Sequence, residues 1–144
     1  MIPENDTERK LNADSALVDA PVALLYYTDL MFGVQLQNMA RKSGYRFANA
    51  RPGATLPDAD VLVVDLGTRG DWETAIREVS GRGVPVIAFG PHMDAEGRRR
   101  AKAAGATRVL ANSNLARDLP RILVDLREHI TTVQEEDDDS EHHS

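Results

Sequence analysis

Apolar and polar residues follow one another along the chain in blocks that predict strands alternating with helices. Short apolar runs bounded by turn residues are typical of buried strands, and apolar residues spaced three or four apart predict helices. The expected strands are 22–27, 45–50, 61–64, 84–89 and 107–111. The expected helices are 30–42, 71–79, 94–104 and a last helix that ends near Ile130. That helix is expected to begin at Asp118 or Leu119, because Pro120 suits a first helical position.

This order predicts an α/β protein with a parallel sheet and right-handed crossovers. For one domain of this length we expect a three-layer α/β/α sandwich. Its five-stranded sheet would have the flavodoxin-like order 2-1-3-4-5. The domain spans 20–130, between a flexible N-terminal arm (1–19) and a disordered acidic tail (131–144).

The net charge of −6 lies in the two ends of the chain rather than in the predicted domain. Residues 1–19 carry five acids and two bases, and residues 131–144 carry six acids and no Lys or Arg. The remaining fifteen bases and twelve acids leave residues 20–130 with a charge of +3. The low isoelectric point therefore does not describe the surface of the domain.

Composition excludes several kinds of chemistry. The 144 residues include no cysteine, which removes disulfides, thiolate nucleophiles and thiolate metal sites. There is no G-x-G-x-x-G after the first strand, no Gly-Lys-Ser/Thr and no metal-ligand spacing. We expect no resident cofactor and no metal site. No signal peptide and no apolar run of roughly 20 residues is present, which predicts a cytoplasmic protein.

The strand that ends in Asp65 carries the strongest functional signal. Four consecutive apolar residues, 61–64, run directly into this carboxylate, which is followed closely by Gly67. In open α/β sheets, ligands and chemistry collect at the carboxyl ends of the strands. The same residue type at a strand end also commonly accepts hydrogen bonds from backbone N–H groups just beyond it, here those of Gly67 or Thr68. Both roles stay open from the sequence.

Three segments resemble the receiver domain of response regulators, the phospho-accepting module of two-component signalling. They are 60–65, 84–89 and 101–110, and the resemblance extends over roughly 21–130. It implies the flavodoxin-like fold and assigns Asp65 to the phospho-acceptor position. It also implies an acidic pair for Mg²⁺, a switch Ser or Thr and a lysine around that aspartate.

The parts that should surround Asp65 are replaced in this chain. The acidic pair falls on Tyr27 and Thr28, with Asp29 one residue late. The switch residue falls on Gly90, the lysine on Asn112 and the proline after it on Ser113. A carboxylate without its metal and ammonium should accept a phosphoryl group poorly. The sequence therefore resembles a degenerate pseudo-receiver.

Two further features are candidates for function. His92, with Gly90, lies at the expected sheet edge and could contact a ligand or titrate near neutral pH, although a plain loop histidine fits equally. Cations cluster on the fourth-helix and fifth-strand face: Arg98, Arg99, Arg100, Lys102 and Arg108. A charge run is often only a solvated surface, but this one could bind an acidic partner, a second copy or the chain's own tail, 135–141. The small size of the patch and the acidic ends argue against nucleic acid.

These observations favour a non-enzymatic pseudo-receiver that regulates through protein contacts, without conventional aspartyl phosphorylation. One alternative is an atypical phospho-acceptor that uses Asp65, with Mg²⁺ and with Asp29 replacing the missing pair. The other is a small-molecule or cofactor module at the sheet edge formed by Asp65, Gly90, His92 and Asn112.

Overall fold

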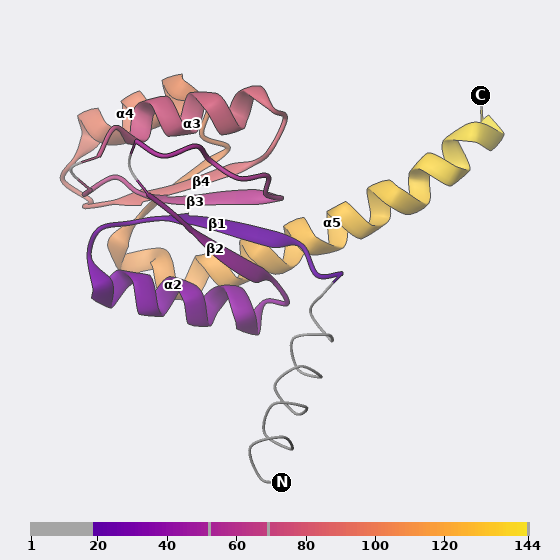
Figure 1. Ribbon diagram of the computed structural model, residues 1–144, viewed down its shortest axis with the longest axis horizontal. Coiled ribbons are helices and arrows are strands. Elements are labelled where there is room, and N and C mark those ends of the chain that lie inside the picture. The colour runs from indigo at the N-terminus through magenta and orange to yellow at the C-terminus, as the bar shows by residue number, and fades with distance from the viewer. Residues whose placement is uncertain (1–18, 52, 69, 144) are drawn as a thin grey trace, which may run out of the picture.

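In the computed structural model, a parallel sheet is covered by helices on both faces (Figure 1). The structure describes residues 19–51, 53–68 and 70–143, and for 130–143 it describes the backbone alone. The elements in chain order are β1 (Val22–Tyr26), α2 (Leu30–Lys42), β2 (Arg46–Ala50), β3 (Val61–Asp65), α3 (Trp72–Gly81), β4 (Val86–Gly90), α4 (Ala95–Ala104), β5 (Arg108–Ala111), the 3-10 helix η1 (Asn112–Asn114) and α5 (Leu115–His143).

The sheet has the order β2-β1-β3-β4-β5, and all four strand pairs are parallel. This confirms the α/β class and the 2-1-3-4-5 order expected from the apolar blocks. β3 lies at the centre of the sheet, and all five of its residues are buried, including Asp65. A strand covered on both faces cannot alternate apolar and polar residues, which explains its unbroken apolar run.

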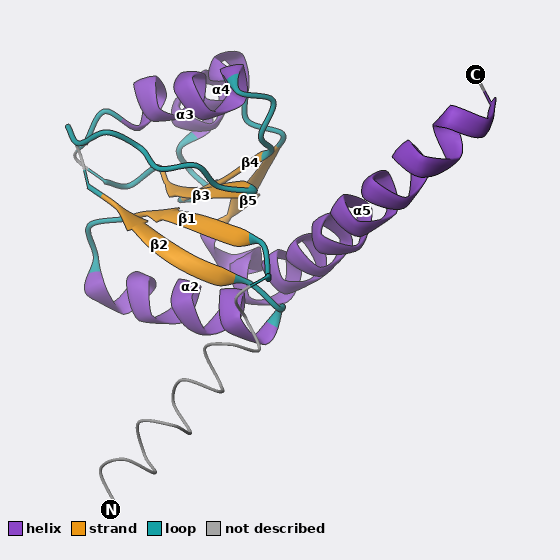
Figure 2. Cartoon of the chain, turned by 45° about the vertical axis from the view of Figure 1, so that its right-hand side comes forward, coloured by secondary structure: helices purple, strands orange, loops and turns teal. Residues whose placement is uncertain are grey.

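The core consists of two apolar layers, one on each face of the sheet. α3 and α4 cover one face, where Trp72, Ile76 and Val79 pack with the side chains of alternate strand residues. α2 and α5 cover the other face, where Leu36, Tyr45 and further core residues lie (Figure 2). Among the described parts of the chain, no helix is long and apolar enough to cross a membrane.

Local chemistry fixes the helix ends. The carboxylates of Asp29, Asp71 and Asp94 cap α2, α3 and α4, each accepting a hydrogen bond from a backbone N–H in the first turn. Gly105 ends α4 with a positive φ of 123°, a conformation that side chains rarely adopt. These caps reproduce the helix boundaries expected from the sequence to within two residues.

The start of the last helix was predicted wrongly. α5 begins at Leu115, directly after η1, and contains Pro120 in its interior. Leu115 and Leu119 are 2% and 1% exposed. Burying two leucines is worth about 1.5–3 kcal/mol each, which offsets the one helical hydrogen bond that proline cannot donate.

The end of α5 also differs from the expectation, because its backbone continues as a helix from near Ile130 to His143. The assignment of 131–144 as a disordered tail stays a prediction, since those side chains and residue 144 lie outside the described residues. The predicted N-terminal arm lies outside them as well, except for Asp19.

Candidate functional site

The carboxyl ends of the parallel strands bring the predicted site residues to one edge of the sheet. Asp65 is the last residue of β3 and pairs in register with Phe89 of β4. Tyr26 pairs with Val64, so Tyr27 follows β1 at the level of Asp65. The register also pairs Gly90 with Ala111, so Asn112 follows β5 at the same edge. Thr28, Asp29 and His92 lie in the adjoining loops and turns, and Ser113 lies in η1.

Asp65 is held by the protein itself. Its side chain is 5% exposed, and its Oδ1 accepts a hydrogen bond of 2.8 Å from the backbone N–H of Gly67. Burial raises the pKa of Asp65, the hydrogen bond from Gly67 opposes that rise, and the carboxylate of Asp29 adds to it. The carboxylate of Asp29 thus acts on Asp65 only through its charge. This hydrogen bond to the N–H of Gly67 is the structural role of Asp65 that the sequence left open beside a functional one.

Asp29 has a structural task of its own. Its Oδ1 accepts a hydrogen bond of 2.8 Å from the N–H of Met31, which caps α2. Thr28 and Asp29 are both exposed. Asp29, one residue beyond the expected acidic pair, therefore serves as a helix cap. Its described effect on Asp65 is electrostatic.

Tyr27 takes the position that the receiver resemblance assigns to a metal-binding acid. Its ring is half-buried and lies against Gly33 of α2 so closely that a Cβ at Gly33 would overlap it. Its hydroxyl accepts a hydrogen bond of 3.0 Å from Nε2 of Gln37. The ring is thus fixed on α2, where it joins the apolar layer below the sheet. Sequence analysis identified the replacement, while Gly33 as its partner was missed.

The residues present do not fit the Mg²⁺ site that the resemblance implies. Mg²⁺ is bound through oxygen ligands, chiefly carboxylates. At this edge, Asp65 accepts a hydrogen bond from Gly67, and Asp29 caps α2. Tyr27, where the resemblance places an acid of the metal-binding pair, has a phenol ring that is bonded to Gln37. Among the described residues, no group of three His, Cys, Asp or Glu could hold a metal ion.

Solved structures of other proteins share this architecture. The signal receiver domain of an HD domain-containing protein from Pseudomonas fluorescens gives a TM-score of 0.66 at 17% identity, covering 78% of this chain and 98% of that one. The receiver domain of the sensor histidine kinase PA1611 from Pseudomonas aeruginosa gives 0.64 at 25% identity, covering 76% and 98%. The receiver domain of the Francisella response regulator 1452 gives 0.62 at 16% identity, also covering 76% and 98%.

This is the fold of a receiver domain. No protein-family model and no curated protein matches the sequence, so the likeness lies in the three-dimensional structure. It confirms the resemblance drawn from the three sequence segments at the level of the fold. The matched receiver domains come from signalling proteins, namely a response regulator and a sensor histidine kinase.

The other predicted residues at the carboxyl edge of the sheet are either closely packed or have polar atoms without a described partner. Gly90, at the switch position, is buried, and a Cβ there would lie 3.2 Å from Cβ of Leu66. Asn112, at the lysine position, has a buried Oδ1 without a hydrogen-bond partner among the described residues. The same holds for Oγ1 of Thr68, a residue that sequence analysis considered only for its backbone. Ser113 is exposed beside Asn112.

Within the receiver fold, His92 is exposed in the loop between β4 and α4. The described interaction of His92 is through its backbone, because its carbonyl accepts a hydrogen bond of 2.9 Å from Nη2 of Arg98. The structure therefore places His92 at the predicted edge without bringing its ring into contact with Asp65.

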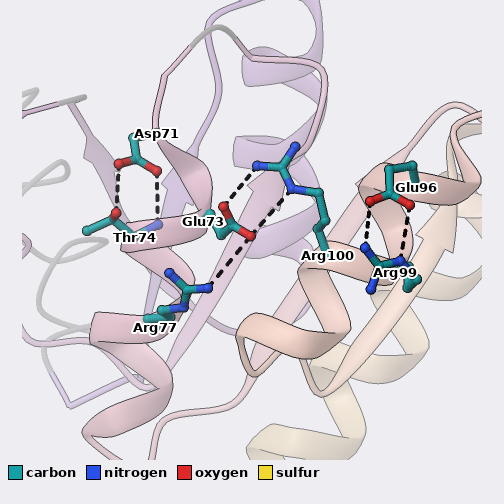
Figure 3. Close-up of polar contacts among 7 residues, drawn as sticks. All are labelled: Asp71, Glu73, Thr74, Arg77, Glu96, Arg99 and Arg100. Carbon is teal, nitrogen blue, oxygen red and sulfur yellow. Dashed lines mark hydrogen bonds and ion pairs between the residues drawn. The ribbon is translucent and has the colours of Figure 1, made fainter.

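Three of the five predicted cations on α4 and β5 are bound within the domain. Two of them, Arg99 and Arg100, are drawn with their partners in Figure 3. Arg98 holds the carbonyl of His92, as just described. Arg99 pairs with Glu96 of its own helix at 2.6 Å. Arg100 reaches Glu73 of α3 at 2.9 Å and lies over the ring of Trp72.

Lys102 and Arg108 remain exposed and form no ion pair within the described part of the chain. A hollow of about 270 Å³ lies on this face. Its lining residues are Ala95, Arg98, Arg99, Lys102 and Val109. The face is therefore less basic than its sequence suggests, because the side chains of Arg98, Arg99 and Arg100 already bind a carbonyl or a carboxylate of the domain.

Proposed function

We propose that this chain is a receiver-fold regulatory module that acts through protein contacts, without conventional aspartyl phosphorylation and without an enzymatic activity of its own. The observation that carries the proposal is the ring of Tyr27, which lies on Gly33 and bonds Gln37 where the receiver resemblance places a metal-binding acid.

The electrostatics of phosphoryl transfer support this proposal. An incoming phosphoryl group brings negative charge to a carboxylate, and a bound cation normally offsets the repulsion. Burial and the nearby Asp29 raise the pKa of Asp65, which means that its surroundings already disfavour negative charge. Asn112, where a receiver would have lysine, supplies no positive charge. Adding a phosphoryl group to Asp65 would increase charge that this edge does not neutralise.

The face of α4 and β5 is the proposed binding surface for the partner protein. Lys102 and Arg108, which form no ion pair with a described acid, supply its positive charge, and the hollow lined in part by Arg98 and Val109 supplies its shape. A partner with acidic side chains fits this surface. The cytoplasmic location inferred from the sequence stays a prediction.

The decisive experiment is incubation of the full chain with Mg²⁺ and acetyl phosphate, read by intact mass and by peptide mapping. We expect no modification of Asp65, and the same result with beryllofluoride followed by fluorine NMR. Asp65→Asn serves as the matched control. Stable modification that Asp65→Asn abolishes would overturn the proposal.

One observation favours a second candidate, an atypical phospho-acceptor: the carboxylate of Asp29 acts electrostatically on Asp65. The PA1611 receiver domain, 25% identical, has a magnesium ion coordinated in its active-site cleft. If Asp29 replaced the missing pair, Asp29→Ser would abolish modification while keeping the helix cap, because serine also caps helices. No observation favours the small-molecule alternative.

A further inference from the structure

The connection between β2 and β3 differs from the other crossovers of the sheet. The connections β1–β2, β3–β4 and β4–β5 contain the helices α2, α3 and α4. The described residues between β2 and β3, 51 and 53–60, form no helix (Figure 2). Leu56 of this segment packs in the apolar layer of α3 and α4. A loop rather than a helix therefore covers the sheet beside α3 on this face, and we call it the β2–β3 loop.

A hollow of about 260 Å³ lies between the β2–β3 loop and α3. Ligand pockets for drug-sized molecules are commonly about 300–1,000 Å³, so this hollow suits a smaller molecule. Arg82, which follows α3, fixes the loop beside the helix, because its guanidinium donates hydrogen bonds of 3.1 Å to the carbonyls of Leu56 and Pro57. The walls of the hollow are therefore held in place by contacts within the domain.

Tyr26, the last residue of β1, gives the hollow a buried phenol. Its side chain lines the hollow and is 2% exposed, and its hydroxyl forms no hydrogen bond with a described residue. Burial raises the pKa of Tyr26, and the carboxylate of Asp71, which also lines the hollow, adds to that rise. The hydroxyl therefore keeps its proton at neutral pH. Buried polar groups are nearly always hydrogen-bonded, so an unpartnered hydroxyl in a hollow indicates a polar ligand.

The walls of the hollow have opposite charges that do not pair with each other. Arg51, on the loop wall, is exposed and forms no ion pair with a described acid. On the α3 wall, Glu78 pairs with Arg82 at 3.0 Å, whereas Asp71 forms no ion pair with a described cation. Asp71 accepts hydrogen bonds from the N–H and the hydroxyl of Thr74, which lower its pKa and keep it ionised at neutral pH. A carboxylate has about four acceptor sites, so Asp71 can accept further hydrogen bonds.

A cation and a carboxylate that line one small hollow without pairing fit a zwitterion. The ammonium of a free α-amino acid has three donors, and the carboxylate of Asp71 and the hydroxyl oxygen of Tyr26 can accept from them. The carboxylate of the amino acid matches the planar guanidinium of Arg51. Leu56 and Ala75, which are 6% and 5% exposed, line the same hollow and suit a short aliphatic side chain.

We propose that the hollow between the β2–β3 loop and α3 binds a free α-amino acid with a short aliphatic side chain. Its carboxylate binds Arg51, and its ammonium binds Asp71 and the hydroxyl of Tyr26. The site is separate from the predicted sheet edge, because Tyr26 belongs to the layer of α3 and α4 while Asp65 follows the strand residues of the other layer. It is also separate from the face of α4 and β5, and it does not depend on the state of Asp65.

Titration calorimetry of the full chain with L-valine tests the proposal. We expect saturable binding, and we expect N-acetyl-L-valine, which has no ammonium, and L-valinamide, which has no carboxylate, to bind about tenfold or more weakly. Arg51→Gln should raise the dissociation constant of L-valine about tenfold. The same substitution should change that of L-valinamide little, because the amide lacks the group that Arg51 binds.

Two further variants separate a lost ligand contact from a general effect. Tyr26→Phe removes only the hydroxyl, so it should weaken L-valine binding several-fold while urea denaturation without ligand stays unchanged. Lys42→Gln removes one positive charge from the exposed end of α2 and should leave the dissociation constant as it is. The proposal would be overturned if L-alanine, L-valine and L-leucine all fail to bind saturably at millimolar concentration. Equal binding of L-valine and its two derivatives would overturn it as well.

Discussion

The two faces of the sheet differ in how far their polar groups are satisfied. On the face of α3 and α4, cations and acids pair within the domain, as in the contact of Arg100 with Glu73. On the face of α2 and α5, Arg41, Lys42 and Arg46 have no described acidic partner. Leu30, Met31 and Val34 of α2 are also 76%, 76% and 57% exposed. Arg99 and Arg100 of α4 are therefore paired with acids of the domain, whereas α2 keeps exposed cations and exposed apolar residues.

The difference extends to the acid at the centre of the sheet. Strand residues alternate between faces, and Val61 and Val63 belong to the layer of α2 and α5. Asp65 therefore lies on the same side as Tyr27. The fold thus keeps the aspartate at the end of β3, while an aromatic residue follows the neighbouring strand β1 on the same face. Four pairs of variants, each with one member on each face, test this comparison.

The largest effect is expected from Gly33→Ala, because the added Cβ would overlap the ring of Tyr27. We expect the free energy of unfolding to fall by about 1–3 kcal/mol, the usual cost of overpacking. On the other face, a Cβ at Gly81 of α3 meets nothing within 4 Å. Gly81→Ala should therefore raise the free energy of unfolding, by about 0.5 kcal/mol. Urea denaturation measures both.

The Gly33 penalty should disappear when Tyr27 is replaced by alanine. A penalty of the same size in the Tyr27→Ala background would show that the ring is not its cause.

Tyr45→Phe should have the next largest effect. Its hydroxyl donates a buried hydrogen bond to Leu123, worth about 1 kcal/mol at neutral pH. Burial raises the pKa of Tyr45 from 10.0 to about 12. The folded chain therefore keeps a proton that the unfolded chain loses, and stability falls as the pH rises from 10 to about 12. That loss is about 2–3 kcal/mol.

Tyr26 is the matched residue on the other face, because it is 2% exposed and its hydroxyl makes no described hydrogen bond. Tyr26→Phe should leave the free energy of unfolding at neutral pH nearly unchanged. Equal losses in the two variants, measured by chemical denaturation, would contradict this account of the α2–α5 contact.

Asp65→Asn and Asp71→Asn should change stability in opposite directions. Burial raises the pKa of Asp65, so its cost to the fold appears as the pH rises above the ordinary aspartate value. Asp65→Asn should stabilise the chain at neutral pH, with the gain vanishing in acid. Hydrogen bonds from Thr74 lower the pKa of Asp71, so its contribution is present at neutral pH and lost as the pH falls. Asp71→Asn should destabilise the chain at neutral pH.

Thermal denaturation from acid to neutral pH measures both curves. Parallel curves for the two variants would show that Asp65 is not penalised by burial.

The smallest effects are expected from the arginines. Arg100→Ala removes the ion pair with Glu73 and the contact with Trp72, so part of its loss should shrink in high salt. Arg41→Ala removes only a contact with Phe47 and lowers local repulsion, so its loss should be smaller and should grow in high salt. Melting temperatures at two salt concentrations compare them, and identical salt responses would contradict the difference between the faces.

Much of the fold could be predicted from the sequence. The run 61–64 identified the central strand, and helix 30–42 was predicted with the bounds of α2. The start of α5 was missed, because the local preference of Pro120 was weighed without the burial of Leu115 and Leu119. Local propensity is a weak guide wherever tertiary burial competes with it.

The candidate site was predictable in its position and less so in its contents. Parallel strands place their carboxyl ends at one edge, so Asp65, Gly90 and Asn112 could be assigned to it from strand ends alone. The packing of Tyr27 on Gly33 could not be predicted, because it depends on the distance between a strand end and a helix.

The sequence by itself determined the order of elements, the sheet and the aspartate at the end of its central strand, because apolar periodicity and turn residues act locally. Only the tertiary structure decided which charges are neutralised. The run 98–100 looked like the basic surface, yet its arginines bind Glu96, Glu73 and a backbone carbonyl. Arg41, Lys42 and Arg46 attracted no attention in the sequence, yet they form no ion pair with a described acid. The sequence gives the position of every charged residue, but the neutralisation of each charge depends on which side chains folding brings within a few ångströms of one another.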